Sequence, residues 1–114
     1  HKIVETVMDK IKIIIIDDHQ LFRNGLKILL NSFPDFEVTG EASNGEEFLK
    51  LIQSVNTDIA LMDINMPELD GIEATRRGLK IVPSINIIAL SMYGEEDYYY
   101  RMVDAGAKGF LLKD

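Results

Sequence analysis

Cysteine is absent from the 114-residue chain. A disulfide framework and a thiolate metal site are therefore excluded, which fits a reducing compartment. Apolar runs are also short, since none approaches the roughly 20 residues that a membrane-spanning helix needs. No basic segment followed by an apolar one opens the chain, as a signal peptide would. From these absences we expect a cytoplasmic protein that has no membrane partner.

Positive charge is scarce as well, with 12 lysine and arginine residues against 19 aspartate and glutamate residues, and a formal net charge of -7. Because no Lys/Arg cluster stands out, we expect this segment to make no direct contact with nucleic acid. Hydrophobic residues make up 46% of the chain and charged residues 27%. This balance and this length predict one ordered domain with a buried core.

The domain is expected over residues 10–114, and residues 1–9 are expected to be an N-terminal extension or a leftover of recombinant expression. Met8 is a candidate native start. A short helical arm is the alternative for the first residues. The chain shows no internal repeat, low-complexity tract or linker that would divide the domain further.

Five runs rich in β-branched and other apolar residues predict strands. Most of them are continuous rather than alternating, which is typical of strands buried on both faces of a parallel sheet. The runs are Ile11–Ile16, Glu37–Ala42, Asp58–Met62, Asn86–Leu90 and Gly109–Leu112.

Helical patterns separate these runs. An apolar stripe extends from Leu21 to Phe33 and ends before Pro34. A second stripe begins at Phe48, after Asn44 as a candidate N-cap. The alternation of strand and helix predicts a doubly wound α/β sheet. The third and fourth helices are expected at Gly71–Ile81 and at Glu95–Ala105, the latter with Gly106 as its C-cap.

Polar side chains stand where the predicted strands end. Asp17 and Asp18 follow the first strand, and Asp63 follows the third. Ser91 follows the fourth strand and Lys113 the fifth. Because the carboxyl ends of parallel strands share one edge of a sheet, where open α/β folds bind ligands, we expect these side chains to converge.

Three carboxylates in one crevice require a cation, and an all-oxygen ligand set favours Mg²⁺. With Lys113 as a second positive charge, such a site suits a phosphoryl group. One carboxylate can act as the nucleophile and form an aspartyl phosphate, while Ser91 donates a hydrogen bond to a phosphoryl oxygen. We interpret His19 as a helix-start residue with a partly exposed ring rather than as a metal ligand or a base.

Each of these residues taken alone has a plainer interpretation. Asp17 and Asp18 suit a helix cap, and Asp63 suits a turn. Ser91 suits a hydrogen bond to the backbone, and Lys113 suits a solvated surface. Only their convergence at one edge of the sheet favours metal binding and phosphoryl chemistry.

The same segments resemble the receiver domain of two-component response regulators. The resemblance covers nearly everything from Lys10 to Asp114, and the segments DDHQLFRNGL and KGFLLKD look most like the NarL/FixJ-type regulators. It implies a flavodoxin-like α/β fold, a doubly wound parallel five-stranded sheet of order 2-1-3-4-5. The motifs that carry it are DDH at 17–19, DINMPELDG at 63–71, ALS at 89–91 and GAKGFLLKD at 106–114.

The resemblance also implies how the site works. Asp63 would be the phosphoacceptor, and Lys113 would contact the phosphoryl oxygens. Asp18, supported by Asp17, would hold Mg²⁺ together with Asp63 and the backbone carbonyl of Asn65. The phosphoryl group would come from a phosphohistidine on a sensor histidine kinase. The family hydrolyses its acyl phosphate slowly, so we expect no enzyme with turnover.

A switch and an output are implied too. Ser91 would follow the phosphoryl group, and the ring of Phe110 would move inward as the aromatic switch. Phe110 lacks the hydroxyl of the commoner tyrosine, so only ring packing remains for it, and Asp114 stands where many receivers carry proline. The expected partners besides the kinase are a homodimer mate and an output domain outside this chain, a DNA-binding helix-turn-helix that regulates transcription.

Two other functions stay open. An aspartate-nucleophile phosphohydrolase would need a D-x-D motif and a cap or substrate pocket, whereas Asp17 and Asp18 are adjacent. A phosphorylation-independent interaction module would ordinarily have lost the acidic pair, Asp63 or Lys113, and all of them are present.

The chain stops at the fifth predicted strand, so the family's last helix is missing from it. Apolar residues of the last two strands should then face the place where that helix lies. We expect a fragment or the ordered part of a longer chain, or else self-association through this face. The residues concerned are Ile87, Ile88, Leu90, Phe110, Leu111 and Leu112.

Overall fold

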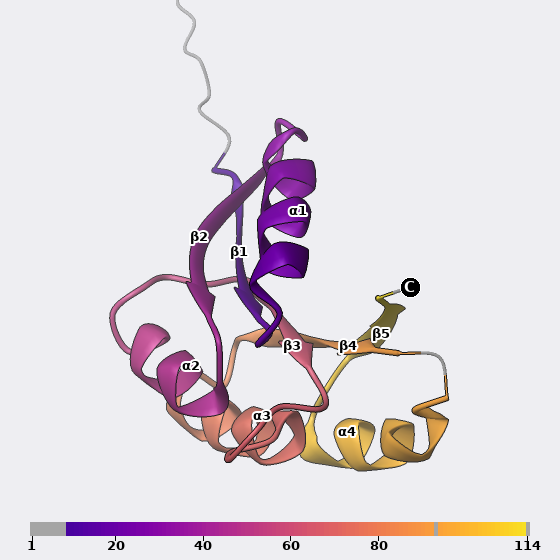
Figure 1. Ribbon diagram of the computed structural model, residues 1–114. Coiled ribbons are helices and arrows are strands. Elements are labelled where there is room, and N and C mark those ends of the chain that lie inside the picture. Colours follow the sequence, from indigo (N-terminus) through magenta and orange to yellow (C-terminus); the bar gives the residue numbers. More distant parts are fainter. Residues whose placement is uncertain (1–8, 93, 114) are drawn as a thin grey trace, which may run out of the picture.

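The computed structural model describes residues 9–92 and 94–113 (Figure 1). Five parallel strands form one sheet of order β2-β1-β3-β4-β5, which confirms the expected order. Their bounds are Ile11–Ile16 for β1, Phe36–Ala42 for β2, Ile59–Asp63 for β3, Asn86–Ser91 for β4 and Gly109–Leu112 for β5. The predicted strands differ from these bounds by one residue at most.

Helices cover both faces of the sheet, with α1 on one face and α2, α3 and α4 on the other (Figure 1). Successive residues of a strand point to opposite faces, so Ile13 and Ile15 pack in a cluster with α1 residues. Ile14 and Ile16 pack in the larger cluster beneath the other helices. The helices are α1 (Gln20–Asn31), α2 (Gly45–Leu51), α3 (Gly71–Ile81) and α4 (Tyr99–Ala105), with a 3₁₀ turn η1 (Glu96–Tyr98) before α4.

Side-chain caps start two of these helices. The Asn44 side chain accepts a hydrogen bond from the backbone N–H of Glu47 at 2.9 Å. The Glu47 carboxylate in turn accepts one from the backbone N–H of Ser43 at 2.7 Å, so the predicted capping arrangement is confirmed. Asp70, which the sequence reading did not single out, caps α3 through the backbone N–H of Glu73 at 2.9 Å.

The fourth helix begins later than predicted. A 3₁₀ turn occupies its first residues, closed by the hydrogen bond from the Tyr98 N–H to the Glu95 carbonyl at 3.0 Å. Gly106 ends α4 as the predicted C-cap. Its φ of 118° is a left-handed conformation, which glycine adopts more easily than other residues.

No helix follows β5 among the described residues, so α1 alone covers its face of the sheet. Leu111 and Leu112 are about half exposed, at 52% and 54%. The expectation of exposure was wrong for Ile87 and Leu90, because Ile87 packs in the larger cluster and Leu90 packs with α1 residues. An apolar groove of about 310 Å³ remains, lined by Ile13, Leu30, Phe36, Ile59, Leu61, Ile88, Gly109, Phe110 and Leu111.

Two expectations fall on parts of the chain that the structure does not describe. The N-terminal extension lies outside the described residues except for Asp9, and so does Asp114. Within the described part, every helix is too short or too polar to cross a membrane.

Candidate functional site

Two backbone hydrogen bonds continue the pairing of neighbouring strands just beyond their carboxyl ends and hold predicted site residues there. The N–H of Asp17 donates to the Ala42 carbonyl at 3.0 Å. The N–H of Lys113 donates to the Ser91 carbonyl at 2.8 Å. Asp63 is itself the last residue of β3. The ends of β1, β3, β4 and β5 therefore place these four side chains along one edge.

Lys113 joins the carboxylates. Its Nζ atom lies 2.8 Å from Asp17 Oδ2 and 3.6 Å from Asp63 Oδ2. All three side chains are at least 95% buried, with exposed fractions of 5%, 0% and 4%. The ammonium also lies 5.0 Å from the centre of the Phe22 ring, which shields it from solvent on the α1 side.

The charges at this edge shift the pKa of two groups. Burial, followed by the nearby Asp17 carboxylate, raises the pKa of Asp63 to about 6, against the partial compensation of Lys113. Burial lowers the pKa of Lys113, but the Asp17 and Asp63 carboxylates outweigh burial and raise it overall. Negative charge is therefore in excess around Asp63, as expected where a cation is to be bound.

The turn after β3 fits closely against the start of α3. A Cβ atom at Gly71 would lie 2.2 Å from the Asp63 carbonyl oxygen, so any larger residue would push the turn away. The N–H of Gly71 donates to the Ile64 carbonyl at 3.0 Å. The backbone N–H of Asn65 donates to Asp63 Oδ1 at 3.3 Å, which orients that carboxylate.

Of the two predicted switch residues, Ser91 is the last residue of β4 and Phe110 is the second residue of β5. Ser91 is fully buried, and its Oγ atom has no hydrogen-bond partner among the described residues. A buried hydroxyl without a partner is costly, so the Ser91 hydroxyl is free to donate a hydrogen bond at this edge of the sheet. The Phe110 ring is half-buried and packs on the Tyr99 ring of α4, with centroids 4.4 Å apart.

Asp18 and His19 form the exposed side of the site. Asp18 is 37% exposed and the His19 side chain 68%, so the expectation of a partly exposed ring is confirmed. His19 Nδ1 lies 3.3 Å from Asp17 Oδ1 and 3.7 Å from Asp18 Oδ1. One ligand atom from each of Asp17, Asp18, His19 and Asp63 lies within 4.8 Å of the others.

A family model described as the response regulator receiver domain matches residues 13–114. The chain belongs to this family. The acidic edge, buried lysine and strand-end hydroxyl lie within the residues that the family model matches.

The relatives of this receiver domain are transcriptional regulators. The transcriptional regulatory protein DegU of Brevibacillus brevis is 44% identical over 106 residues, which cover 93% of this chain and 45% of the relative. The transcriptional regulatory protein LiaR of Bacillus subtilis is 41% identical over 103 residues, covering 90% of this chain and 49% of the relative. The chain therefore spans about half the length of these relatives.

Solved structures agree with the fold. The signal receiver domain of NarL from Mycobacterium tuberculosis is 33% identical with a TM-score of 0.86, covering 94% of this chain and 86% of that chain. A LuxR-family two-component response regulator from Aurantimonas is 29% identical with a TM-score of 0.87, covering 93% of this chain and 76% of that chain. The resemblance to the NarL/FixJ-type regulators is confirmed.

Arg23 supports the acidic loop of the receiver domain, and the sequence reading missed it. Its guanidinium donates to the backbone carbonyl of Asp17 and, at 3.2 Å, to Glu41 Oε1. Burial would raise the pKa of Glu41, but hydrogen bonds from Lys27 and Arg23 lower it below its ordinary value. The available signal was spacing, since Arg23 stands one helical turn after His19 and so faces back over the loop.

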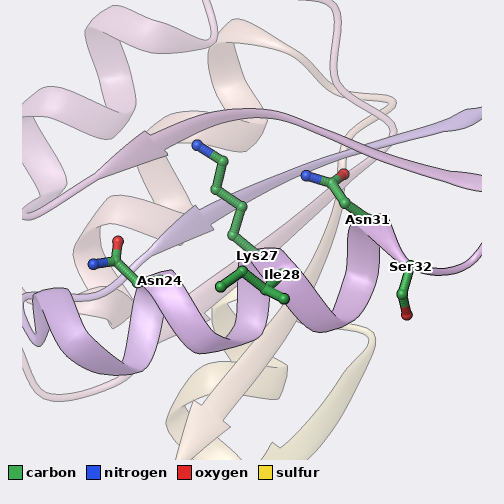
Figure 2. Close-up of a pocket in the computed structure, with 5 residues that line it drawn as sticks. All are labelled: Asn24, Lys27, Ile28, Asn31 and Ser32. Atoms are coloured by element: carbon green, nitrogen blue, oxygen red, sulfur yellow. The ribbon is translucent and has the colours of Figure 1, made fainter.

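A second hollow of the receiver domain lies along α1 and contains none of these residues. It is an open depression of about 590 Å³ lined by Asn24, Lys27, Ile28, Asn31 and Ser32 (Figure 2). Its one charged side chain, Lys27, lies 3.1 Å from Glu41 Oε2 and is therefore already paired. Its lining brings together no group suited to catalysis or metal binding.

Proposed function

We propose that this receiver domain is a phosphorylation-controlled signalling switch whose phosphoacceptor is Asp63. The observation that carries the proposal is the buried Asp63 carboxylate, 3.6 Å from the Lys113 ammonium and beside the Asp17 carboxylate. The donor is a phosphohistidine on a sensor histidine kinase. The bond from phosphorus to the imidazole nitrogen breaks as the bond from phosphorus to an Asp63 oxygen forms.

The remaining site residues receive the transferred group. Lys113 offsets the negative charge of the phosphoryl oxygens, because its ammonium already lies between Asp17 and Asp63. Ser91 donates its free hydroxyl to one of those oxygens. Phe110 then fills the space that the hydroxyl leaves, by changing its packing against Tyr99. The effect is a population shift between two arrangements of β4 and its neighbours.

The donor set fits Mg²⁺. Asp17, Asp18 and Asp63 bring carboxylate oxygens within reach of one another, and the backbone carbonyl of Asn65 is the fourth proposed ligand. Bound Mg²⁺ would supply positive charge for the phosphoryl oxygens. Burial first, and then the neighbouring carboxylates, raise the pKa of Asp63, and a bound cation would stabilise the charged carboxylate against both.

The output is proposed from the relatives, whose names describe them as transcriptional regulatory proteins. We assign this chain a DNA-binding output domain outside its 114 residues, a homodimer mate and a cytoplasmic location. Turnover is limited to slow hydrolysis of the domain's own acyl phosphate, so it is not an enzyme in the usual sense.

Intact-mass measurement after incubation with acetyl phosphate and Mg²⁺ tests the proposal. The expected product carries one phosphoryl group, mapped to Asp63 after trapping of the acyl phosphate. Asp63→Asn should abolish the adduct, whereas Asp104→Asn, which alters an exposed carboxylate on α4, should keep it.

Other results would favour the rival functions. An adduct on Asp17 or Asp18 would contradict the assignment of the phosphoacceptor. Multiple turnover of added phosphoesters would support a phosphohydrolase. No adduct and no turnover would support a phosphorylation-independent interaction module.

A further inference from the structure

We infer that His19 is a direct ligand of the metal ion in this site, through its Nδ1 atom. The site then has a mixed nitrogen and oxygen ligand set, suited to a borderline divalent cation such as Zn²⁺ as well as to Mg²⁺. The inference rests on the proposed metal site and adds a residue and a class of ligand to it. It also reverses the interpretation of His19 as only a helix-start residue.

The first observation is that His19 holds a capping position without capping. It is the N-cap of α1, yet its side chain makes no cap hydrogen bond. A serine, threonine, aspartate or asparagine there would stabilise the helix start through its side chain. Its backbone N–H instead donates to Asp17 Oδ1 at 2.8 Å, which ties the base of the side chain to the acidic pair.

The second observation is the spacing of the ligand atoms. Two ligands of one ion, each about 2.0–2.2 Å from it, lie about 3–4 Å apart. His19 Nδ1 is 3.3 Å from Asp17 Oδ1 and 3.7 Å from Asp18 Oδ1. Both separations fit a shared ion without rearrangement of the loop.

The third observation is that a positive charge already lies against the imidazole. Lys113 Nζ is 3.2 Å from His19 Nδ1 and 2.8 Å from Asp17 Oδ2. An ammonium has donors only, so the nitrogen that faces it presents a lone pair. A metal ion needs the same lone pair, aimed at the same carboxylates. A metal ion bound to Nδ1 would therefore take the place of the ammonium against the imidazole, and Lys113 would keep only its carboxylate partners.

The chemistry of the ligand decides the selectivity. Mg²⁺ prefers oxygen ligands in a strict octahedral arrangement and keeps several waters. Imidazole suits Zn²⁺, whereas carboxylate, carbonyl and water ligands suit Mn²⁺ as they do Mg²⁺. A site with His19 as a ligand should thus gain affinity for Zn²⁺ that an all-carboxylate site lacks.

Electron spin echo measurements on the Mn²⁺ complex test whether His19 is a ligand. The protein carries His1→Ala, so that His19 is its only histidine. The expected result is a ¹⁴N modulation from a directly bound imidazole, absent in His19→Phe and in His19→Gln. A complex without nitrogen modulation in the parent protein would overturn the inference.

Calorimetric titrations with Zn²⁺ and Mg²⁺ test the selectivity. Loss of a group that merely supports a metal ligand costs roughly 10–100-fold in affinity, so loss of a direct ligand should cost at least as much for Zn²⁺. The affinity for Mg²⁺ should change by less than about threefold, because water replaces the imidazole in its shell. Equal losses for the two metals in both variants would contradict the inference. His19→Gln separates ring packing from ligation, since neither variant offers imidazole but only one keeps a ring.

The proposed function is tested separately in the same samples. Formation of the Asp63 adduct with Mg²⁺, without nitrogen ligation of Mn²⁺, would reject His19 as a ligand and leave the switch intact. Nitrogen ligation without any adduct would reject the switch and leave the metal site.

Discussion

Burial places the Asp63 carboxylate where its negative charge is unfavourable. Its pKa rises from an ordinary value of 3.8 to about 6, so in this window the folded state binds more protons than the unfolded state. Stability therefore falls as pH rises from about 4 to about 6, and the whole penalty is present at pH 7. In the proposed reaction the charged form attacks phosphorus, so the proposed function requires the less stable protonation state.

Asp63→Asn should raise the free energy of unfolding at pH 7 by roughly 1–3 kcal/mol without added metal, because the amide carries no charge to bury. The gain should shrink below pH 4, where the wild-type carboxyl is protonated in both states. Chemical denaturation of both proteins at a series of pH values measures the difference. If Asp63→Asn is less stable than wild type at pH 7, the buried Asp63 carboxylate does not destabilise the folded state.

The two acidic residues before α1 have different surroundings. The Asp17 side chain is fully buried, accepts the His19 N–H and pairs with Lys113. Asp18 is 37% exposed and has oxygen atoms open to solvent. Adjacent residues that leave a strand point in different directions.

Asp18→Asn should therefore reduce Mg²⁺ affinity more than Asp17→Asn does. Titration of Mg²⁺ into each variant, with folding checked by thermal unfolding, gives the two affinities. Equal losses, or a greater loss for Asp17→Asn, would reject Asp18 as the principal ligand of the pair.

At the scale of the element, α3 carries a glycine that helix propensity alone would disfavour. Gly78 costs α3 about 1 kcal/mol relative to alanine. The structure supplies the reason, because a Cβ atom at Gly78 would lie 2.6 Å from Phe48 Cε2 of α2. The close approach of α2 and α3 keeps Phe48 fully buried in the core.

Gly78→Ala should consequently lower the free energy of unfolding, by about 1–3 kcal/mol for an overpacked core position, despite its better helix propensity. Gly25→Ala is the matched control, because a Cβ atom there would meet nothing within 4 Å. This control should raise stability by roughly 0.5–1 kcal/mol. Denaturant unfolding of the two variants and the wild type gives the changes in the free energy of unfolding. A stabilising Gly78→Ala would contradict the packing argument.

At the scale of the whole molecule, one face of the sheet is incompletely covered. The apolar groove beside α1 extends to β5, where Leu111 is 52% exposed. Each large side chain left uncovered forfeits roughly 1.5–3 kcal/mol of burial. The outer edge of β5 is unpaired among the described strands, and such edges favour association.

The 114-residue chain should therefore self-associate at low micromolar concentration and bind a hydrophobic dye. Leu111→Lys, which places a charge in the groove, should reduce both the self-association and the dye binding. Leu21→Lys is the control, because Leu21 is 86% exposed on α1 and does not line the groove. Sedimentation velocity measures the association. A cooperatively unfolding monomer that binds no dye would show that this face is already covered.

Local patterns in the sequence were enough for the elements and for the polar edge. Continuous apolar runs predicted strands to within one residue, and Asn44 and Gly106 predicted helix ends, because caps depend on neighbours a few residues away. Asp63 and Lys113 could be placed at one edge because parallel strands share their carboxyl side. None of these inferences needed the identity of a distant contact.

Only the tertiary structure decided which side chains meet across that edge. The hydrogen bond from Arg23 to Glu41, the packing of Tyr99 on Phe110 and the contact of His19 with Lys113 join segments that the sequence separates. Their partners depend on how helices pack on the sheet and on side-chain rotamers within the folded state. These are non-local quantities, and no periodicity or motif in the chain encodes them directly.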